Sequence, residues 1–197
     1  DLKPGLLFCE KLAKKYKVYY ANGNHELRLK DEKYDGLYDE LNKSAKKMGI
    51  CRLEDSCKQL EDICIYGLDI DKKYYKKLDN AEFDKSYIEK KLGSAKDKYY
   101  NILLAHSPLF LNAYADWGAD LVLSGHFHGG TIRVWKDIGL MTPQIHFFSD
   151  MVHGLKKKND TNLIISSGLG THSINIRLND RAELILIELL PLHTDKD

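Results

Sequence analysis

Two histidines one residue apart, His126 and His128, follow the apolar run 121–125, which ends in a glycine, and two more glycines come directly after them. Imidazole is a good ligand for borderline divalent cations such as zinc, iron, manganese and nickel. Glycines allow a tight turn and the close approach of a ligand. The pattern predicts a buried strand with two imidazoles in the loop at its carboxyl end, where open α/β sheets bind ligands. Taken alone, a pair of structural loop histidines is an equally good interpretation.

A second candidate strand end lies early in the chain. The β-prone run over residues 17–21 is followed by Gly23, Asn24, His25 and Glu26. Glu26 is either a further polar group of the site or the cap of the next helix. Capping is the default for a carboxylate that enters a helix, because the helix N-terminus has partial positive charge.

A third apolar run, over residues 102–105, ends at His106, and Pro108 prevents that strand from continuing. Because one arrangement occurs three times, a composite site is favoured over unrelated loop histidines. An Asn carbonyl oxygen together with imidazole nitrogens is typical of a mixed oxygen and nitrogen metal site. The sequence therefore predicts that Asn24, His106 and the His126/His128 loop contribute to one metal centre.

The remaining periodicity predicts an α/β fold, a layered sandwich in which helices and strands alternate early and strands predominate late. The segment 71–98 is rich in charged residues and Tyr, and a solvated insertion is a better interpretation of it than a lid. Helices are expected over 5–16, 32–48 and 109–116, and strands over 17–21, 63–68, 102–105, 120–124, 131–135, 163–167 and 184–190.

The bulk composition narrows the classes of function. The sequence has 30 Lys and Arg residues and 29 Asp and Glu residues, which gives a formal charge of +1. This balance gives no electrostatic reason to expect a nucleic-acid partner. No apolar run is long enough to span a membrane. The four cysteines form no Cys-x-x-Cys pair, which favours free thiols over a disulfide. Lys156–Lys158 and the following Asn159-Asp160 predict a solvated hairpin tip, with attraction of an anionic lipid or phosphate as the alternative.

The chain resembles the calcineurin-like metallophosphoesterases, in particular their small bacterial branch. The resemblance rests on three motifs in the family's order, Gly23–Glu26, Ala105–Pro108 and Ser124–Gly130, together with parts of the segment 168–184. It covers nearly the whole chain. It implies a single, partial domain over residues 1–197 with a layered α-β-β-α sandwich fold of the metallophosphoesterase type.

The resemblance also implies roles for individual residues. Asn24, His106 and His126 match the ligands of the family's second metal, and His128 matches a ligand of the first. His25 matches the histidine that contacts the scissile phosphate and protonates or stabilises the leaving oxygen. The implied cofactors are two divalent or transition metal ions (Mn, Fe or Zn), which hold a bridging hydroxide in line with phosphorus. The implied reaction is hydrolysis of a phosphodiester or a pyrophosphate-type bond.

Two family motifs are missing from the sequence. The family places Asp-x-His and Gly-Asp-x-x-(Asp/Asn) before its Asn-His motif, and nothing before Gly23 matches either of them. These motifs supply the other ligands of the first metal and the carboxylate that bridges both metals. We interpret the chain as an incomplete form of a longer enzyme that lacks its first strands. The alternatives are a non-catalytic scaffold and a mononuclear metal-binding module that uses Asn24, His106 and His126.

The expected substrate is a small-molecule or lipid-linked phosphoester. Membrane association is expected only through a missing amino-terminal segment, so the predicted location is cytoplasmic or peripheral to the membrane.

Overall fold

A six-stranded sheet forms the centre of the structure, a computed structural model that describes residues 2–76, 82–128, 133–135, 138–141, 147–149, 151–170 and 181–191. The strand order is β10-β11-β6-β5-β4-β3, with parallel pairing from β11 through β4 and an antiparallel hairpin at each edge. The strands are β3 (Ser56–Leu60), β4 (Ile63–Leu68), β5 (Tyr100–Ala105), β6 (Leu121–Ser124), β10 (Gly154–Lys158) and β11 (Thr161–Ile165).

A second, two-stranded parallel sheet packs against β3 and β4. It consists of β1 (Tyr19–Ala21) and β2 (Cys51–Leu53). The two sheets approach most closely at Gly67 in β4, where a Cβ atom would lie 2.3 Å from the carbonyl oxygen of Leu53. Only glycine lets the two backbones come this close.

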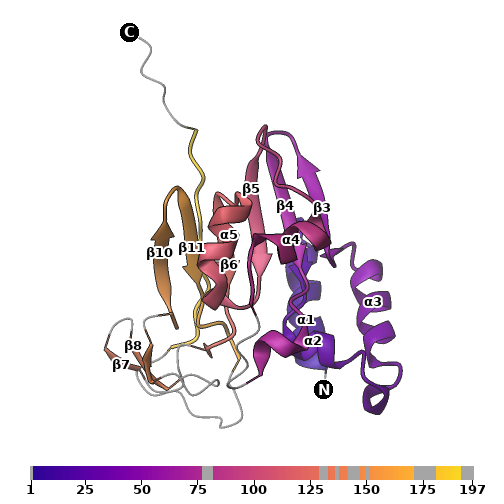
Figure 1. The fold of residues 1–197 in the computed structure, drawn as a ribbon. Coiled ribbons are helices and arrows are strands. Elements are labelled where there is room, and N and C mark those ends of the chain that lie inside the picture. Colours follow the sequence, from indigo (N-terminus) through magenta and orange to yellow (C-terminus); the bar gives the residue numbers. More distant parts are fainter. Residues whose placement is uncertain are drawn as a thin grey trace.

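Helices cover the outer faces of both sheets. Figure 1 shows α4 and α5 on the central sheet, and they pack against each other there, whereas α1 and α3 contact each other beside the smaller sheet. The resulting layers confirm the predicted α-β-β-α sandwich. The helices are α1 (Lys3–Ala13), α2 (Asn24–Arg28), α3 (Leu37–Lys47), α4 (Lys85–Leu92) and α5 (Leu111–Trp117), and the 3-10 turns are η1 (Glu32–Tyr34), η2 (Lys72–Tyr75) and η3 (Pro108–Phe110).

The hydrophobic core lies between the central sheet and the α4/α5 layer. Trp117 is its largest side chain, and its ring meets the ring of Tyr66 edge-on with the centroids 4.9 Å apart. The indole Nε1 donates a hydrogen bond to the carbonyl oxygen of Gly93 over 2.8 Å. A further antiparallel sheet is formed by β7 (Arg133–Trp135), β8 (Ile138–Met141) and β9 (Phe147–Ser149).

Several predicted elements are present close to their expected bounds. Strand 63–68 is confirmed at both ends, and the first helix begins at Lys3 with Pro4 in its first turn. The predicted helix 32–48 is divided into η1 and α3 at Gly36, whose φ of +73° interrupts helical geometry. The hairpin tip at Asn159-Asp160 is confirmed, with Asn159 at φ +52°.

Two predictions about elements were wrong. Residues 184–190 form no strand: Leu186 is 96% exposed, and 181–191 pair with no strand in the described part of the chain. Apolar alternation alone cannot form a strand without a neighbouring strand to bond to. The segment 71–98 is also more than a solvated insertion, because Tyr74 and Ile88 are buried in the core. Of the predicted strand 131–135, residues 131 and 132 lie outside the described residues.

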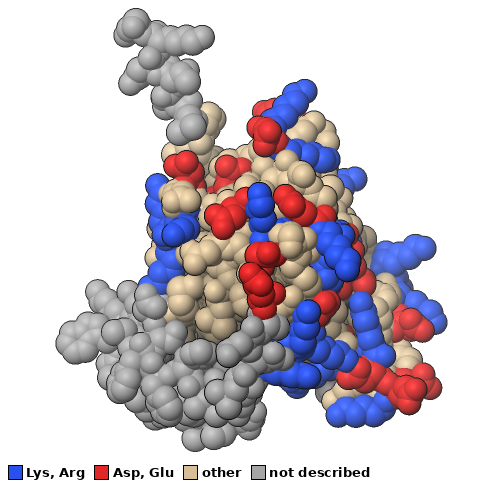
Figure 2. Space-filling model, viewed as in Figure 1, with Lys and Arg blue, Asp and Glu red and all other residues tan. Residues whose placement is uncertain are grey.

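The surface has no large region of one charge. Figure 2 shows acidic and basic side chains interspersed over the visible face, in keeping with the balanced composition. No helix in the described ranges has the length and apolar character needed to cross a membrane. The four cysteines are free thiols.

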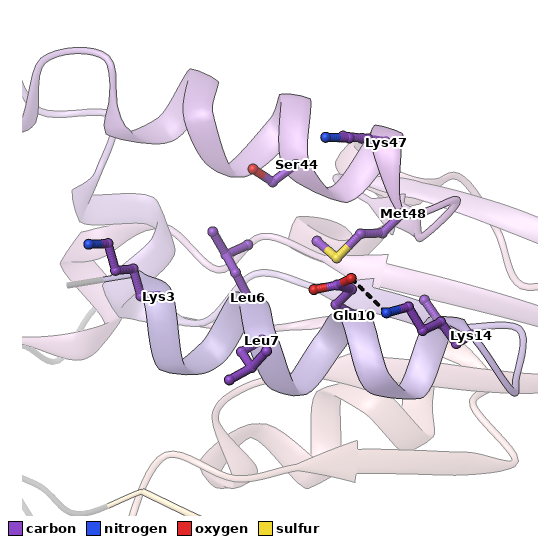
Figure 3. A pocket seen from close by; sticks show the side chains of 9 residues that line it. Lys3, Leu6, Leu7, Glu10, Lys14, Ser44, Lys47 and Met48 are labelled. Atoms are coloured by element: carbon purple, nitrogen blue, oxygen red, sulfur yellow. Dashed lines mark ion pairs between the residues drawn. The ribbon is translucent and has the colours of Figure 1, made fainter.

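The outer face of α1 is poorly covered. No residue of this helix is buried, and Leu7 and Phe8 are 55% and 41% exposed. A groove of about 580 Å³ separates α1 from α3, with Leu6 and Met48 between the helices and the Glu10–Lys14 ion pair at its side (Figure 3). None of the histidines predicted to bind metal lines this groove.

Candidate metal centre

Two of the predicted ligands lie at the carboxyl ends of neighbouring parallel strands. His106 directly follows β5, and His126 comes two residues after β6. The backbone N–H of Gly125 donates to the carbonyl oxygen of His106 over 3.1 Å, which fixes the two loops against each other. The imidazole centroids lie 5.2 Å apart. The structure therefore brings together two histidines that are 20 residues apart in the sequence.

The third strand end comes from the smaller sheet. After β1 the chain turns at Gly23 into the short helix α2, and Gly23 lies directly against the His106 ring. The N–H of Gly23 donates to Oε2 of Glu26 over 2.8 Å, so Glu26 caps the helix as expected. Burial raises the pKa of Tyr20, and the Glu26 carboxylate adds to this shift.

Asn24, the first residue of α2, contributes a buried oxygen atom with no hydrogen-bond partner among the residues that the structure describes. Its side chain is buried. A buried carbonyl oxygen without a partner costs about 1–3 kcal/mol, so such atoms call for an explanation. A bound cation would satisfy this atom, because amide oxygens are hard ligands. The donor set therefore fits a metal ion.

His106 is electrically neutral at physiological pH. Burial lowers the pKa of its imidazole to about 4; the Glu26 carboxylate opposes this shift, and His128 and His25 add to it. A neutral imidazole has a free lone pair, which metal coordination requires.

The loop after β6 has an unusual backbone. His126 and His128 have φ angles of +73° and +48°, in the left-handed region that non-glycine residues rarely adopt. Such conformations cost about 1–3 kcal/mol each and persist where the surroundings impose them, often at functional sites. Between them, Phe127 is completely buried and anchors the loop, while Nδ1 of His128 lies 3.3 Å from the carbonyl oxygen of Gly170.

Tyr75 at the end of η2 is a member of the site that the sequence did not reveal. Its ring centroid lies 5.0 Å from that of His126 and 6.3 Å from that of His106. The hydroxyl is buried and lacks a hydrogen-bond partner within the described ranges, and burial raises its pKa, so it stays protonated. The segment expected to be a solvated insertion thus contributes an aromatic wall to the histidine pair.

A buried polar network holds the turn before Asn24. Nδ2 of Asn22 donates to both carboxylate oxygens of Asp69 over 3.0 Å, and Arg52 donates to Oδ1 of Asn22. Burial raises the pKa of Asp69, and Asn22 and Lys30 oppose the shift. Asp69 directly follows β4, so the strand-end pattern was a signal that could have identified it.

Two further histidines, His25 and His153, occupy less central positions. His25 is exposed on α2 beside Asn24, and Nε2 of His153 lies 2.9 Å from Oε2 of Glu183. Within the described ranges, no three His, Cys, Asp or Glu side chains form a cluster that could hold a metal on their own. The asparagine oxygen is a further donor of a kind that this count of His, Cys, Asp and Glu does not include.

Replacing Gly23 with alanine is expected to weaken metal binding about tenfold. This is the lower end of the loss in metal affinity that is typical when a residue that orients a metal ligand is replaced. A Cβ atom at this position would lie 2.8 Å from Oε2 of Glu26 and 3.1 Å from Cε1 of His106, so the imidazole has to shift. A Co²⁺ titration followed by absorbance measures the affinity. Gly125→Ala is the matched control, because its Cβ would have no neighbour closer than 3.8 Å. Equal affinities for the two variants would contradict the prediction.

Comparisons with known proteins identify the family to which the chain is related. The sequence profile of the calcineurin-like phosphoesterase family matches residues 4–130. The uncharacterized metallophosphoesterase YkoQ of Bacillus subtilis is 29% identical over 179 residues, which are 89% of this chain and 61% of that protein. An uncharacterized metallophosphoesterase of Helicobacter pylori (strain J99) is 31% identical over 193 residues, or 96% of this chain and 47% of that protein.

The metallophosphoesterase Cj0846 of Campylobacter jejuni, also uncharacterized, is 30% identical over 194 residues, 96% of this chain and 46% of that protein. The chain thus spans less than two thirds of the length of each of these relatives. No solved structure matches it.

The layered fold and the histidine-bearing strand ends define a metallophosphoesterase domain. Because the profile match covers more than half of the sequence, the chain belongs to the calcineurin-like phosphoesterase family. Members of this family are, in general, phosphoester hydrolases that use divalent metal ions.

Proposed function

We propose that the protein containing this chain hydrolyses a phosphodiester or a pyrophosphate-type bond in a metal-dependent reaction. The observation that supports this most strongly is the buried Oδ1 of Asn24, which has no partner among the described residues. Asn24 directly follows Gly23, which lies against the ring of the neutral His106. A cation bound at this position would give the oxygen the partner that it lacks among the described residues.

Each residue of the site has a distinct task in the proposal. Asn24, His106 and His126 hold the second metal, and His128 is a ligand of the first. His25, exposed at the start of α2, faces incoming substrate and donates a proton or a hydrogen bond to the leaving oxygen. When bound, the two metal ions supply Lewis acidity and a water-derived nucleophile at neutral pH. Manganese, iron and zinc all suit such nitrogen and oxygen ligands.

The other ligands of the first metal, including a bridging carboxylate, come in this proposal from strands that precede the chain. Three features of the fold support additional strands: the short β1, which pairs only with β2 in the described part of the chain; the uncovered face of α1; and the extended, exposed segment around Leu186. Strands added beside β1 would cover such surfaces and form their own hydrogen bonds.

The second candidate function is a mononuclear metal-binding module. It is favoured by the lack of any cluster of three His, Cys, Asp or Glu side chains in the ranges that the structure describes. In that case Asn24, His106 and His126 bind one ion without turnover. A non-catalytic scaffold on the same fold is the third alternative, and it requires no metal.

The substrate in this proposal is a small-molecule or lipid-linked phosphoester, with no nucleic-acid partner. The balanced charges of the visible surface support this, because nucleic-acid binding depends on a basic surface. We also propose that the protein acts in the cytoplasm or at the membrane surface.

Turnover of bis-p-nitrophenyl phosphate by the longest gene product that contains this chain tests the function. We expect hydrolysis with added Mn²⁺ or Zn²⁺, its loss with a chelator, and its recovery when metal is returned. Metal binding without turnover would favour the mononuclear module. If the protein shows neither metal binding nor turnover, the non-catalytic scaffold is the function that the result favours.

A further inference from the structure

A basic pocket adjoins the candidate metal centre. It has a volume of about 530 Å³, in the range of small-molecule sites, and Asn24 and Tyr75 form the part that it shares with the centre. Blue side chains gather in Figure 2 over the region where α2 and η2 lie in Figure 1. The pocket's lining residues are Asn24, Arg28, Asp31, Lys33, Tyr34, Lys72, Tyr75 and Lys76.

The lining has a strong excess of positive charge, with four cationic side chains and one carboxylate. Asp31 pairs with Lys72, and Nζ of Lys33 lies 4.6 Å from the centroid of the Tyr34 ring. Arg28 and Lys76 form no ion pair with any residue that the structure describes. Two cations close together repel each other, and an anion between them removes that repulsion.

The chemistry of the lining suits a phosphate group. The Arg28 guanidinium presents a planar fork of donors that matches phosphate oxygens, and lysine ammonium groups add point charges. The pocket is larger than one phosphate needs, so it also has room for the group attached to it.

We propose that this pocket binds a second phosphate of the substrate, so that the natural substrate contains a diphosphate and the bond hydrolysed is a pyrophosphate bond. The inference rests on the proposed function and on Asn24. If this side chain binds metal at the scissile phosphate, the phosphate joined to it through one bridging oxygen lies immediately alongside, where the pocket begins. A substrate with one phosphate leaves Arg28 and Lys76 without an anion from the described residues.

Steady-state kinetics on the longest gene product with two substrates test the proposal. One substrate is a dinucleoside diphosphate, and the other is bis-p-nitrophenyl phosphate, which has a single phosphate. In the double variant Arg28→Gln, Lys76→Gln, the ratio of kcat/KM for the diphosphate to that for the monophosphate diester is expected to fall at least tenfold, mainly through a higher KM for the diphosphate.

The matched control is Lys14→Gln, Lys47→Gln, which removes two cations from the α1/α3 groove and shares no residue with the pocket. This control is expected to keep the wild-type ratio. An equal loss with both substrates in the pocket variant, or an unchanged ratio, would overturn the inference. Thermal unfolding of each variant shows whether it has kept its fold.

Binding of inorganic pyrophosphate, measured by calorimetry against inorganic phosphate, separates this inference from the proposed function. We expect pyrophosphate to bind the wild type more tightly and the pocket variant at least tenfold more weakly. If turnover fails while this difference persists, the proposed function is wrong and the pocket assignment stands. If pyrophosphate binds both proteins equally or neither of them, the pocket assignment is wrong.

Discussion

Asn24→Ala is expected to weaken Mn²⁺ or Zn²⁺ binding by at least about 100-fold, since a direct ligand matters more than the groups that orient one. The metal-free protein should be no less stable than the wild type. The substitution removes a buried oxygen that has no partner in the described part of the chain, so no hydrogen bond is lost. Lower metal affinity together with undiminished stability is the result specific to a ligand role. A metal titration and urea unfolding in chelator measure the two quantities.

Asn101→Ala is the matched control for that experiment. Asn101 is also buried, but its Nδ2 donates to the carbonyl oxygens of Lys96 and Tyr99 over 3.2 and 3.1 Å. Its loss should reduce the free energy of unfolding by about 1–3 kcal/mol and leave metal affinity unchanged. If Asn24→Ala behaved in the same way as this control, Asn24 would be a structural residue and the metal assignment would be wrong.

Gly67→Ala is expected to cause the largest loss of stability, about 3 kcal/mol in the free energy of unfolding. The new Cβ atom would lie 2.3 Å from the carbonyl oxygen of Leu53 and 2.5 Å from its Cβ, and neither backbone can move without separating the sheets. Urea unfolding followed by circular dichroism measures the change. Because β1 and β2 belong to the smaller sheet, metal affinity should fall as well.

The control for Gly67 is Gly5→Ala in α1, where a Cβ atom would meet nothing within 4 Å. Alanine favours the helix over glycine by about 0.5–1 kcal/mol, so this variant should be equally or more stable. A Gly67→Ala protein as stable as this control would show that β2 does not pack tightly on β4.

The meeting of His106 and His126 could be predicted from the sequence because each lies within two residues of the end of an apolar strand. Adjacent parallel strands end at the same edge of a sheet, and β5 and β6 are such a pair. His106 and His126, which follow these strands, therefore come together at that edge. The role of Glu26 as a helix cap was likewise predictable from its place in the first turn of α2.

Other parts of the site depend on contacts that no local pattern encodes. Tyr75 reaches His126 because η2 packs beside α2, and the partner of Asn22 is Asp69, which is 47 residues away. The strand expected at 184–190 did not form because a strand needs a neighbour as well as a suitable sequence. The fold class was predictable because it depends on the order of helices and strands along the sequence. The contacts of Tyr75 and Asn22 were not predictable, because they join segments that are distant in the sequence.

Anomalous X-ray diffraction from crystals of the protein grown with Mn²⁺ or Zn²⁺ tests the central claim most directly. The account predicts a metal peak about 2.0–2.2 Å from Oδ1 of Asn24 and from one imidazole nitrogen each of His106 and His126. A metal bound elsewhere, or a peak near the histidines with the Asn24 oxygen turned away from it, would contradict the account.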